Sequence, residues 1–167
     1  MDKLMIKPAL TDEALKEISV LADEIWHEHF TPIIGEEQVE YMVEKFQSYQ
    51  AITHQVKEDG YEYFQFLYDG EEAGYLGIKE EPERLFLSKI YVKKSFRGRK
   101  IASQAIRFLV DRCREKGLSA IWLTVNRENK NSIAAYETMG FVKTREQKAD
   151  IGNGFYMDDY IMEKPVA

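Results

Sequence analysis

The sequence predicts a mixed α/β (α+β) domain in which helices flank a central, largely antiparallel sheet. Three observations lead to this fold class. Residues 61–92 contain three successive strand-like runs joined by turns, which is typical of an antiparallel meander. Residues 85–125 then follow the order strand, helix, strand, a unit that makes its two strands parallel. Two further strand-like runs, residues 141–148 and 155–163, form a hairpin near the end of the chain.

Composition sets the broad class of the protein. The chain has 167 residues, 44% of them hydrophobic and 13% aromatic, so we expect a single domain over residues 1–167. It has neither an apolar signal core after Met1 nor a long uncharged apolar run, so we expect a soluble, cytoplasmic protein without a membrane partner. The net charge of −6 argues against a nucleic-acid partner. The one cysteine, Cys113, falls on an apolar helix stripe and is predicted to be a buried, inert thiol.

The N-terminal third is predicted to contain one strand and three helices. The strand covers residues 3–8. The first helix starts after Thr11, whose hydroxyl can cap it, and is predicted to end at Pro32. A second amphipathic helix follows Gly35, and a shorter one covers residues 51–58. Both are predicted to pack on the core.

Aromatic and histidine side chains cluster near the end of the first helix. They are Trp26, His27, His29 and Phe30. They could line a pocket, but core aromatics with surface histidines are the favoured interpretation. The chain's three histidines form no His-x-x-x-His pair and have no cysteines near them, so we expect no metal site.

The middle of the chain is predicted to be strand-rich. Residues 61–68 and 72–80 form a hairpin around Asp69-Gly70, and residues 85–92 form the next strand. A helix over residues 100–116 follows, with Gly117 at its end. Such a meander supplies a scaffold for chemistry located elsewhere.

A basic turn, Arg97-Gly98-Arg99-Lys100, separates the 85–92 strand from this helix. Cationic side chains and unpaired N–H groups there meet the positive end of the helix dipole. The turn is therefore either an anion site, most naturally for phosphate, or a solvated basic turn. The turn by itself does not decide between the two.

The C-terminal third begins with a short buried strand, residues 120–125. Asn129 or Asn131 can cap the helix that follows, and Gly140 can end it. Asp158 and Asp159 interrupt the last strand. They are either solvated edge positions, the favoured interpretation, or a site for a substrate cation.

Two segments together resemble the GCN5-related N-acetyltransferase (GNAT) family, which uses acetyl-coenzyme A. The family's phosphate turn reads Arg/Gln-x-x-Gly-x-Gly/Ala, and Arg97 to Ala102 matches it at both ends, with Lys100 in place of the first glycine. A side chain there restricts φ, although a lysine at an ordinary helix start would cost little. The second signature, with a shortened gap before the tyrosine, is matched by Asn131, Ala134, Tyr136, Gly140 and Phe141.

This resemblance implies a GNAT-type fold and a role for each part of the site. Backbone N–H groups of the 85–92 strand would hold the pantetheine and the thioester carbonyl, and the turn would anchor the diphosphate. Asn131 would bond the pantetheine and Tyr136, as the catalytic residue, would protonate the leaving thiolate. A phenol with a pKa near about 10 keeps its proton at pH 7; the alternative for Tyr136 is a core aromatic. The cofactor-binding residues so implied are Ile90, Tyr91, Val92, Arg97, Gly98, Arg99, Lys100, Ile101, Ala102, Ser103 and Asn131.

The general base is left open by the sequence. No carboxylate occupies the middle of the 85–92 strand, where some relatives carry a glutamate. Glu28, His29, Asp150 and Asp158 are candidates, and a water chain would serve equally.

The resemblance therefore implies an enzyme that transfers the acetyl group of acetyl-CoA directly to a primary amine, in a ternary complex and without metal. The acidic charge balance favours a small polyamine-like or amino-acid-derived amine. The alternatives are a peptide or protein amino-terminal or lysine acetyltransferase, and a non-catalytic CoA-binding sensor or interaction protein. Relatives often pair through sheet edges, which leaves a homodimer open.

Overall fold

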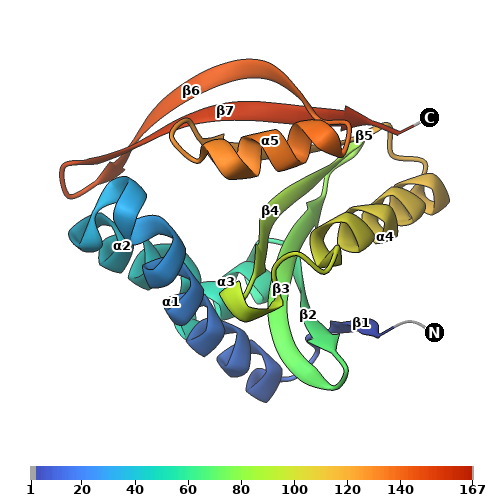
Figure 1. Cartoon of the computed structure of the whole chain (residues 1–167), viewed down its shortest axis with the longest axis horizontal. Helices are drawn as coiled ribbons and strands as arrows, with labels where there is room; N and C mark the ends of the chain where they lie inside the picture. Colours follow the sequence, from blue (N-terminus) through green and yellow to red (C-terminus); the bar gives the residue numbers. More distant parts are fainter. Residues whose placement is uncertain (1–2, 167) are drawn as a thin grey trace. The chain divides into compact units, whose positions relative to one another are not determined.

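The computed structural model describes residues 3–166 and has an α+β fold. Within these residues a seven-stranded, mixed, mostly antiparallel sheet has the order β1-β2-β3-β4-β5-β7-β6, which confirms the predicted fold class (Figure 1). The strands are β1 (Leu4–Pro8), β2 (Tyr61–Tyr68), β3 (Glu71–Glu80), β4 (Arg84–Val92), β5 (Ala120–Asn126), β6 (Val142–Gly152) and β7 (Phe155–Pro165). The α-helices are α1 (Asp12–Ile34), α2 (Glu36–Met42), α3 (Tyr49–Glu58), α4 (Ile101–Lys116) and α5 (Lys130–Thr138).

The chain divides into two compact units. The first comprises Met1–Lys79 and Lys89–Ala105, and the second comprises Glu80–Ser88 and Ile106–Ala167. Strand β4 and helix α4 contribute residues to both. Over residues 3–166, no helix is both long enough and apolar enough to cross a bilayer.

Helix α1 of the first unit begins where the sequence predicted and ends later. The Thr11 hydroxyl accepts a hydrogen bond from the N–H of Ala14 at 3.1 Å, which confirms the cap. The prediction that Pro32 ends the helix is wrong, because α1 continues to Ile34 and stops at Gly35, where φ is 88°. Proline removes only one hydrogen bond in the last turn, and the buried apolar face of α1 outweighs that loss.

Helix α2 runs into a π-helical turn, Val43–Gln47, before α3 begins. The Ser48 hydroxyl caps α3 by accepting from the N–H of Ala51 at 3.2 Å. Gln47, in the π-helical turn, is buried and accepts a hydrogen bond from the Tyr75 hydroxyl at 2.8 Å. The turn therefore carries a polar side chain into the core of the first unit.

Strands β2 and β3 form the predicted hairpin around Asp69-Gly70, whose φ angles are both positive. Strand β3 also lies very close to the end of β4. A Cβ atom on Gly74 would lie 2.1 Å from the carbonyl oxygen of Tyr91. The N–H of Lys93 donates to the carbonyl of Ala73 at 2.7 Å beside it. Only glycine permits this approach of the two backbones.

The second unit confirms the parallel strand pair and corrects the last strand. Residues 84–86 of β4 pair in parallel with residues 120–122 of β5. Strand β7 pairs with β5 on one side and β6 on the other, so the prediction that Asp158 and Asp159 occupy an edge strand is wrong. Asp159 is buried, with an exposed fraction of 3%. Figure 1 shows α5 running alongside the β6–β7 hairpin.

The core of this unit contains Cys113, which is fully buried as a free thiol. Burial raises the pKa of that thiol. The predicted burial of this thiol is thereby confirmed, and its inertness stays a prediction.

The Gly74→Ala variant tests the close approach of β3 and β4. Because the new methyl group meets a backbone oxygen, we expect the free energy of unfolding to fall by about 3 kcal/mol. Urea denaturation measures the change. The control is Glu71→Ala, an exposed position on the same strand, which should stay within about 0.5 kcal/mol of the wild type. An unchanged midpoint for Gly74→Ala would contradict the close approach.

Candidate functional site

The turn between β4 and α4 has a backbone suited to an anion. A short 3-10 turn, Lys94–Phe96, leads into it, and α4 begins at Ile101. Between them Gly98 and Lys100 have φ angles of 82° and 61°. The first N–H groups of α4 follow this turn directly, and the first N–H groups of a helix have no partner inside it and lie at the positive end of the helix dipole. This conformation matches the phosphate interpretation of the sequence.

Lys100 stands in the left-handed region and not at an ordinary helix start. A non-glycine residue pays about 1–2 kcal/mol for this conformation. Its carbonyl oxygen accepts three hydrogen bonds at 3.1 Å each, from the N–H of Gln104, the Gln104 amide and the Ser103 hydroxyl. These bonds hold the backbone in the shape that glycine adopts freely.

Helix α1 braces the turn through ion pairs. The Arg97 guanidinium donates to both carboxylate oxygens of Glu28, at 2.6 and 3.2 Å, and to the carbonyl of Val92 at 2.9 Å. Lys93 pairs with Glu24, one helical turn earlier, at 3.6 Å. The side chain of Arg97 is thus engaged by protein groups, and Glu28, a candidate base in the sequence, is held as a counter-ion.

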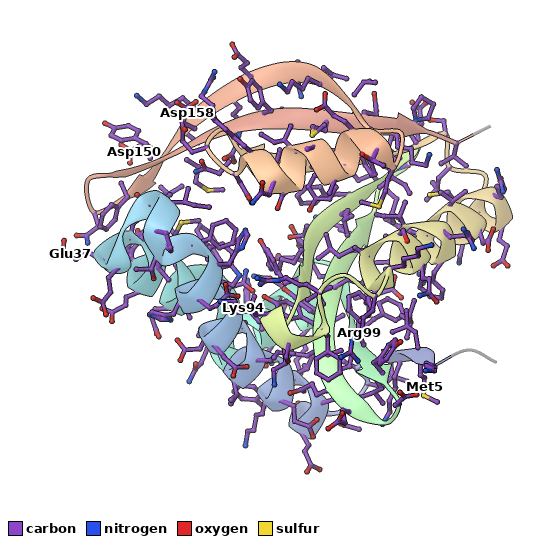
Figure 2. All side chains as sticks on the ribbon, in the orientation of Figure 1. Met5, Glu37, Lys94, Arg99, Asp150 and Asp158 are labelled. Carbon is purple, nitrogen blue, oxygen red and sulfur yellow. The ribbon has the colours of Figure 1, made fainter. Side chains whose placement is uncertain are left out.

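Arg99 and Lys94 extend from the turn, as Figure 2 shows. The Arg99 guanidinium lies 5.1 Å from the ring centroids of both Tyr68 and Phe96. Both cations are exposed. They give the turn positive charge, and among residues 3–166 no carboxylate forms an ion pair with Arg99.

The last residues of β4, Ile90, Tyr91 and Val92, lead directly into the turn. The Tyr91 ring packs against Trp26 at 5.5 Å, Phe30 at 5.9 Å and Tyr75 at 5.6 Å between centroids. Trp26 and Phe30 are buried, so they are core aromatics, as the favoured interpretation had it.

Lys89 is the residue that sequence reasoning missed. It is only 7% exposed, and its Nζ donates to the Gln55 side-chain oxygen at 2.7 Å and to the Tyr63 hydroxyl. The rings of Tyr61 and Tyr63 lie 5.5 and 5.0 Å away. Burial lowers the pKa of Lys89 to about 7. The sequence could have predicted its burial, because Lys89 follows the buried Leu85 and Leu87 at every second position of the strand.

Tyr63 completes this polar cluster. Its hydroxyl donates to the Gln55 oxygen at 2.5 Å. Burial raises the pKa of Tyr63 well above its ordinary value, so the phenol keeps its proton. The Lys89 cluster, meaning Lys89, Gln55, Tyr61 and Tyr63, lies entirely in the first unit.

Tyr136 lies on α5 in the second unit. Its ring packs against Phe141 at 5.6 Å, and its carbonyl accepts from the N–H of Phe141 at 3.0 Å. Gly140, with φ of 97°, ends the helix as predicted. Burial raises the pKa of Tyr136 to about 12, so the phenol keeps its proton at neutral pH.

The two asparagines before Tyr136 differ in their surroundings. Asn129 is the residue at the helix cap and is 5% exposed, and its carbonyl accepts from the N–H of Ile133. Asn131 is exposed in the first turn of α5. The role of Asn131 toward pantetheine remains a prediction.

Carboxylates of the second unit are mostly engaged. Asp158 accepts from the Arg127 guanidinium at 3.2 Å, and the same guanidinium bonds Glu146 at 2.8 Å. Asp150 accepts from the N–H of Gly152 at 2.8 Å, near the tip of the hairpin in Figure 2. Burial, with a smaller contribution from Asp158, raises the pKa of Asp159 to about 6. Among residues 3–166, no group of histidine, cysteine and carboxylate side chains is arranged to hold a metal ion.

Comparison with known proteins decides the family. The model of the acetyltransferase (GNAT) family matches residues 21–141, well over half of the chain. The chain belongs to the GNAT family. It is therefore an acyltransferase, an N-acetyltransferase for which acetyl-CoA is the cosubstrate typical of the family.

Relatives cover nearly the whole chain. An uncharacterised N-acetyltransferase in the pepI 3′ region of Lactobacillus delbrueckii subsp. lactis is 24% identical over 163 residues, 93% of this chain and 94% of that protein. PaiA N-acetyltransferase from Thermoplasma acidophilum, solved with coenzyme A, has a TM-score of 0.77 and 22% identity over 97% of this chain and 98% of that one. Spermidine N-acetyltransferase from Vibrio cholerae, a dodecamer, has a TM-score of 0.67 and 18% identity over 98% and 94%.

The Lys100→Gly variant tests the left-handed residue in the turn. Glycine relieves a cost of about 1–2 kcal/mol and adds about 0.5–1 kcal/mol of unfolded-state entropy, so we expect a net stabilisation of about 0.5–1 kcal/mol in urea denaturation. Lys100→Ala removes the same charge but keeps the strain, and should not stabilise. Equal effects of the two variants would show that Lys100 is not strained.

Proposed function

We propose that this chain transfers the acetyl group of acetyl-CoA directly to the primary amine of a small polyamine-like or amino-acid-derived molecule, in a ternary complex. The observation that carries the proposal is the turn with left-handed Gly98 and Lys100 at the start of α4, in a chain of this family. Its N–H groups suit a diphosphate, which is the part of coenzyme A that most needs charge-complementary donors.

The cosubstrate site combines backbone and side-chain groups. The backbone of Arg97 and of residues 98–103 binds the diphosphate, while the side chains of Arg99 and Lys100 add positive charge. The backbone of Ile90, Tyr91 and Val92 holds the pantetheine and the thioester carbonyl, and Asn131 bonds the pantetheine. Because the Arg97 guanidinium is held by Glu28 and Val92, its side chain positions the turn.

Tyr136 acts as the acid for the leaving sulfur. Its pKa of about 12 keeps the phenol protonated at pH 7. Transfer of that proton to a thiolate is uphill, because a thiol has a pKa of about 8.5. The step is completed when the phenolate takes a proton from the positively charged nitrogen of the tetrahedral intermediate, which is far more acidic. Tyr136 is then restored as the amide forms.

The acceptor is assigned from charge. The net charge of −6 attracts cationic amines to the protein. The fold is shared with a spermidine N-acetyltransferase, which supports a polyamine within the proposed class.

Thiol release from acetyl-CoA tests the function and Tyr136 together. We expect turnover with spermidine, putrescine or glycinamide to exceed turnover with a tetrapeptide bearing a free amino terminus. We expect Tyr136→Phe to lower kcat by about 10²-fold, because the acid is lost. Coenzyme A should raise the melting temperature of both proteins equally.

The matched control is Tyr156→Phe, since Tyr156 is an exposed tyrosine of β7. It should leave kcat unchanged. Preference for the tetrapeptide would replace the small amine with a peptide acceptor. Stabilisation by coenzyme A without turnover on any amine would contradict the enzymatic proposal and favour a CoA sensor.

A further inference from the structure

Three of the four side chains that the sequence offered as general bases are engaged by other groups of the protein, and the fourth, His29, is half-buried with its ring 4.7 Å from that of Phe30. Glu28 forms a two-point ion pair with Arg97, Asp158 pairs with Arg127, and Asp150 accepts from a hairpin N–H. The oxygens of these three carboxylates already accept hydrogen bonds from groups of the protein.

Among residues 3–166, burial shifts the pKa of three side chains toward neutral pH: Lys89 and Glu72 in the first unit and Asp159 in the second. The cation of Lys93 acts against burial at Glu72, whereas burial acts unopposed at Lys89.

We propose that Lys89 is the general base that takes the proton from the acceptor ammonium. This inference rests on the proposed function. Lys89 immediately precedes Ile90, so it lies on the strand whose backbone is proposed to hold the thioester. Asp159 lies on β7 and is the alternative that a variant below tests.

The Lys89 cluster is built to receive a proton. An ammonium at Nζ has oxygen acceptors in the Gln55 side chain at 2.7 Å and in the Tyr63 hydroxyl, and it faces the ring of Tyr61. These groups are polar or aromatic but uncharged. They can stabilise a positive charge that forms on Nζ during the reaction, but unlike a carboxylate they do not keep the lysine protonated throughout.

The same surroundings keep the neutral form accessible. The groups that face Lys89 are Gln55 from α3 and Tyr61 and Tyr63 from β2, all uncharged at neutral pH. Among residues 3–166, no carboxylate forms an ion pair with Lys89. Burial therefore acts unopposed, and with a pKa of about 7 the amine is half neutral at pH 7.

The magnitude of the pKa favours this lysine over an ordinary carboxylate. An alkylammonium has a pKa of about 10.4. Giving its proton to a group with a pKa of about 7 is unfavourable by about 10³-fold. Giving it to an unperturbed carboxylate, with a pKa of about 4, is unfavourable by about 10⁶-fold. A base with a pKa near the working pH is also the most effective proton acceptor.

The protons balance over one turnover. The neutral Nζ of Lys89 accepts one proton from the acceptor ammonium, and the freed amine attacks the thioester carbonyl carbon. The carbon–sulfur bond breaks, the sulfur takes the Tyr136 proton, and the nitrogen returns its second proton to Tyr136. Lys89 then releases its proton to solvent. The products are the acetamide, coenzyme A and one proton.

The pH dependence of kcat/KM tests this role, with spermidine and, if it is inactive, the best amine of the panel above. We expect the wild type to lose activity about tenfold per pH unit below pH 7, since the lysine is then protonated. The acceptor amine itself titrates at about pH 10, so it does not cause this fall in activity below pH 7, the acidic limb of the pH profile.

Two variants separate a base from a structural cation. Lys89→Arg keeps the positive charge but cannot accept a proton, so we expect a loss of about 10²-fold or more in kcat with an unchanged coenzyme A-dependent thermal shift. Gln55→Glu places a carboxylate beside Nζ and raises the lysine pKa, so we expect the limb to move upward by at least about one pH unit. Asp159→Asn is the control and should leave the limb near pH 7.

Retention of activity by Lys89→Arg within about threefold would overturn the proposal, as would an unmoved limb in Gln55→Glu. Loss of the limb in Asp159→Asn would transfer the role to that carboxylate. A wild type that acetylates no amine contradicts the proposed function itself. An active wild type with an active Lys89→Arg variant contradicts the base alone.

Discussion

The conformation of the turn after β4 is the constraint on which the proposed chemistry depends. In the proposed site the N–H groups of this turn and of the start of α4 bind a diphosphate, and their directions are set by a backbone in which Gly98 and Lys100 have positive φ angles. This conformation is unfavourable for lysine, and three hydrogen bonds to the Lys100 carbonyl oxygen stabilise it. The ion pairs of Arg97 and Lys93 with helix α1 hold the start of the same turn. Side-chain interactions thus stabilise one backbone conformation of the turn.

Binding and chemistry are divided between different kinds of group. In the proposed mechanism, the backbone of β4 and of the turn would bind the pantetheine and the diphosphate of coenzyme A. The ionisable side chains would transfer protons, and burial sets the protonation state of each. Burial keeps the Tyr136 phenol protonated and lowers the pKa of Lys89 to about 7, and among residues 3–166 neither side chain forms an ion pair. Desolvation alone therefore separates the two roles.

Periodicity and turn residues predicted the fold well, because local preferences and burial agree along most of the chain. The hairpins, the parallel pair of β4 and β5, and the cap at Thr11 are all of this kind. Pro32 was misjudged because tertiary packing of α1 outweighs one lost hydrogen bond. The aspartates of β7 were misjudged because the order of strands in a sheet cannot be read from neighbouring residues. A polar residue in a strand suggests an edge position, but β6 pairs with β7 on the side away from β5. Lys89 was passed over because its partners, Gln55 and Tyr63, are distant in sequence.

The most direct test of the account is a titration of the ¹⁵N-labelled protein with coenzyme A, followed through its amide resonances. The account predicts saturable shifts in the N–H groups of residues 98–103, and no such shifts with pantetheine, which lacks the diphosphate. Binding of coenzyme A that leaves those amides unmoved would contradict it.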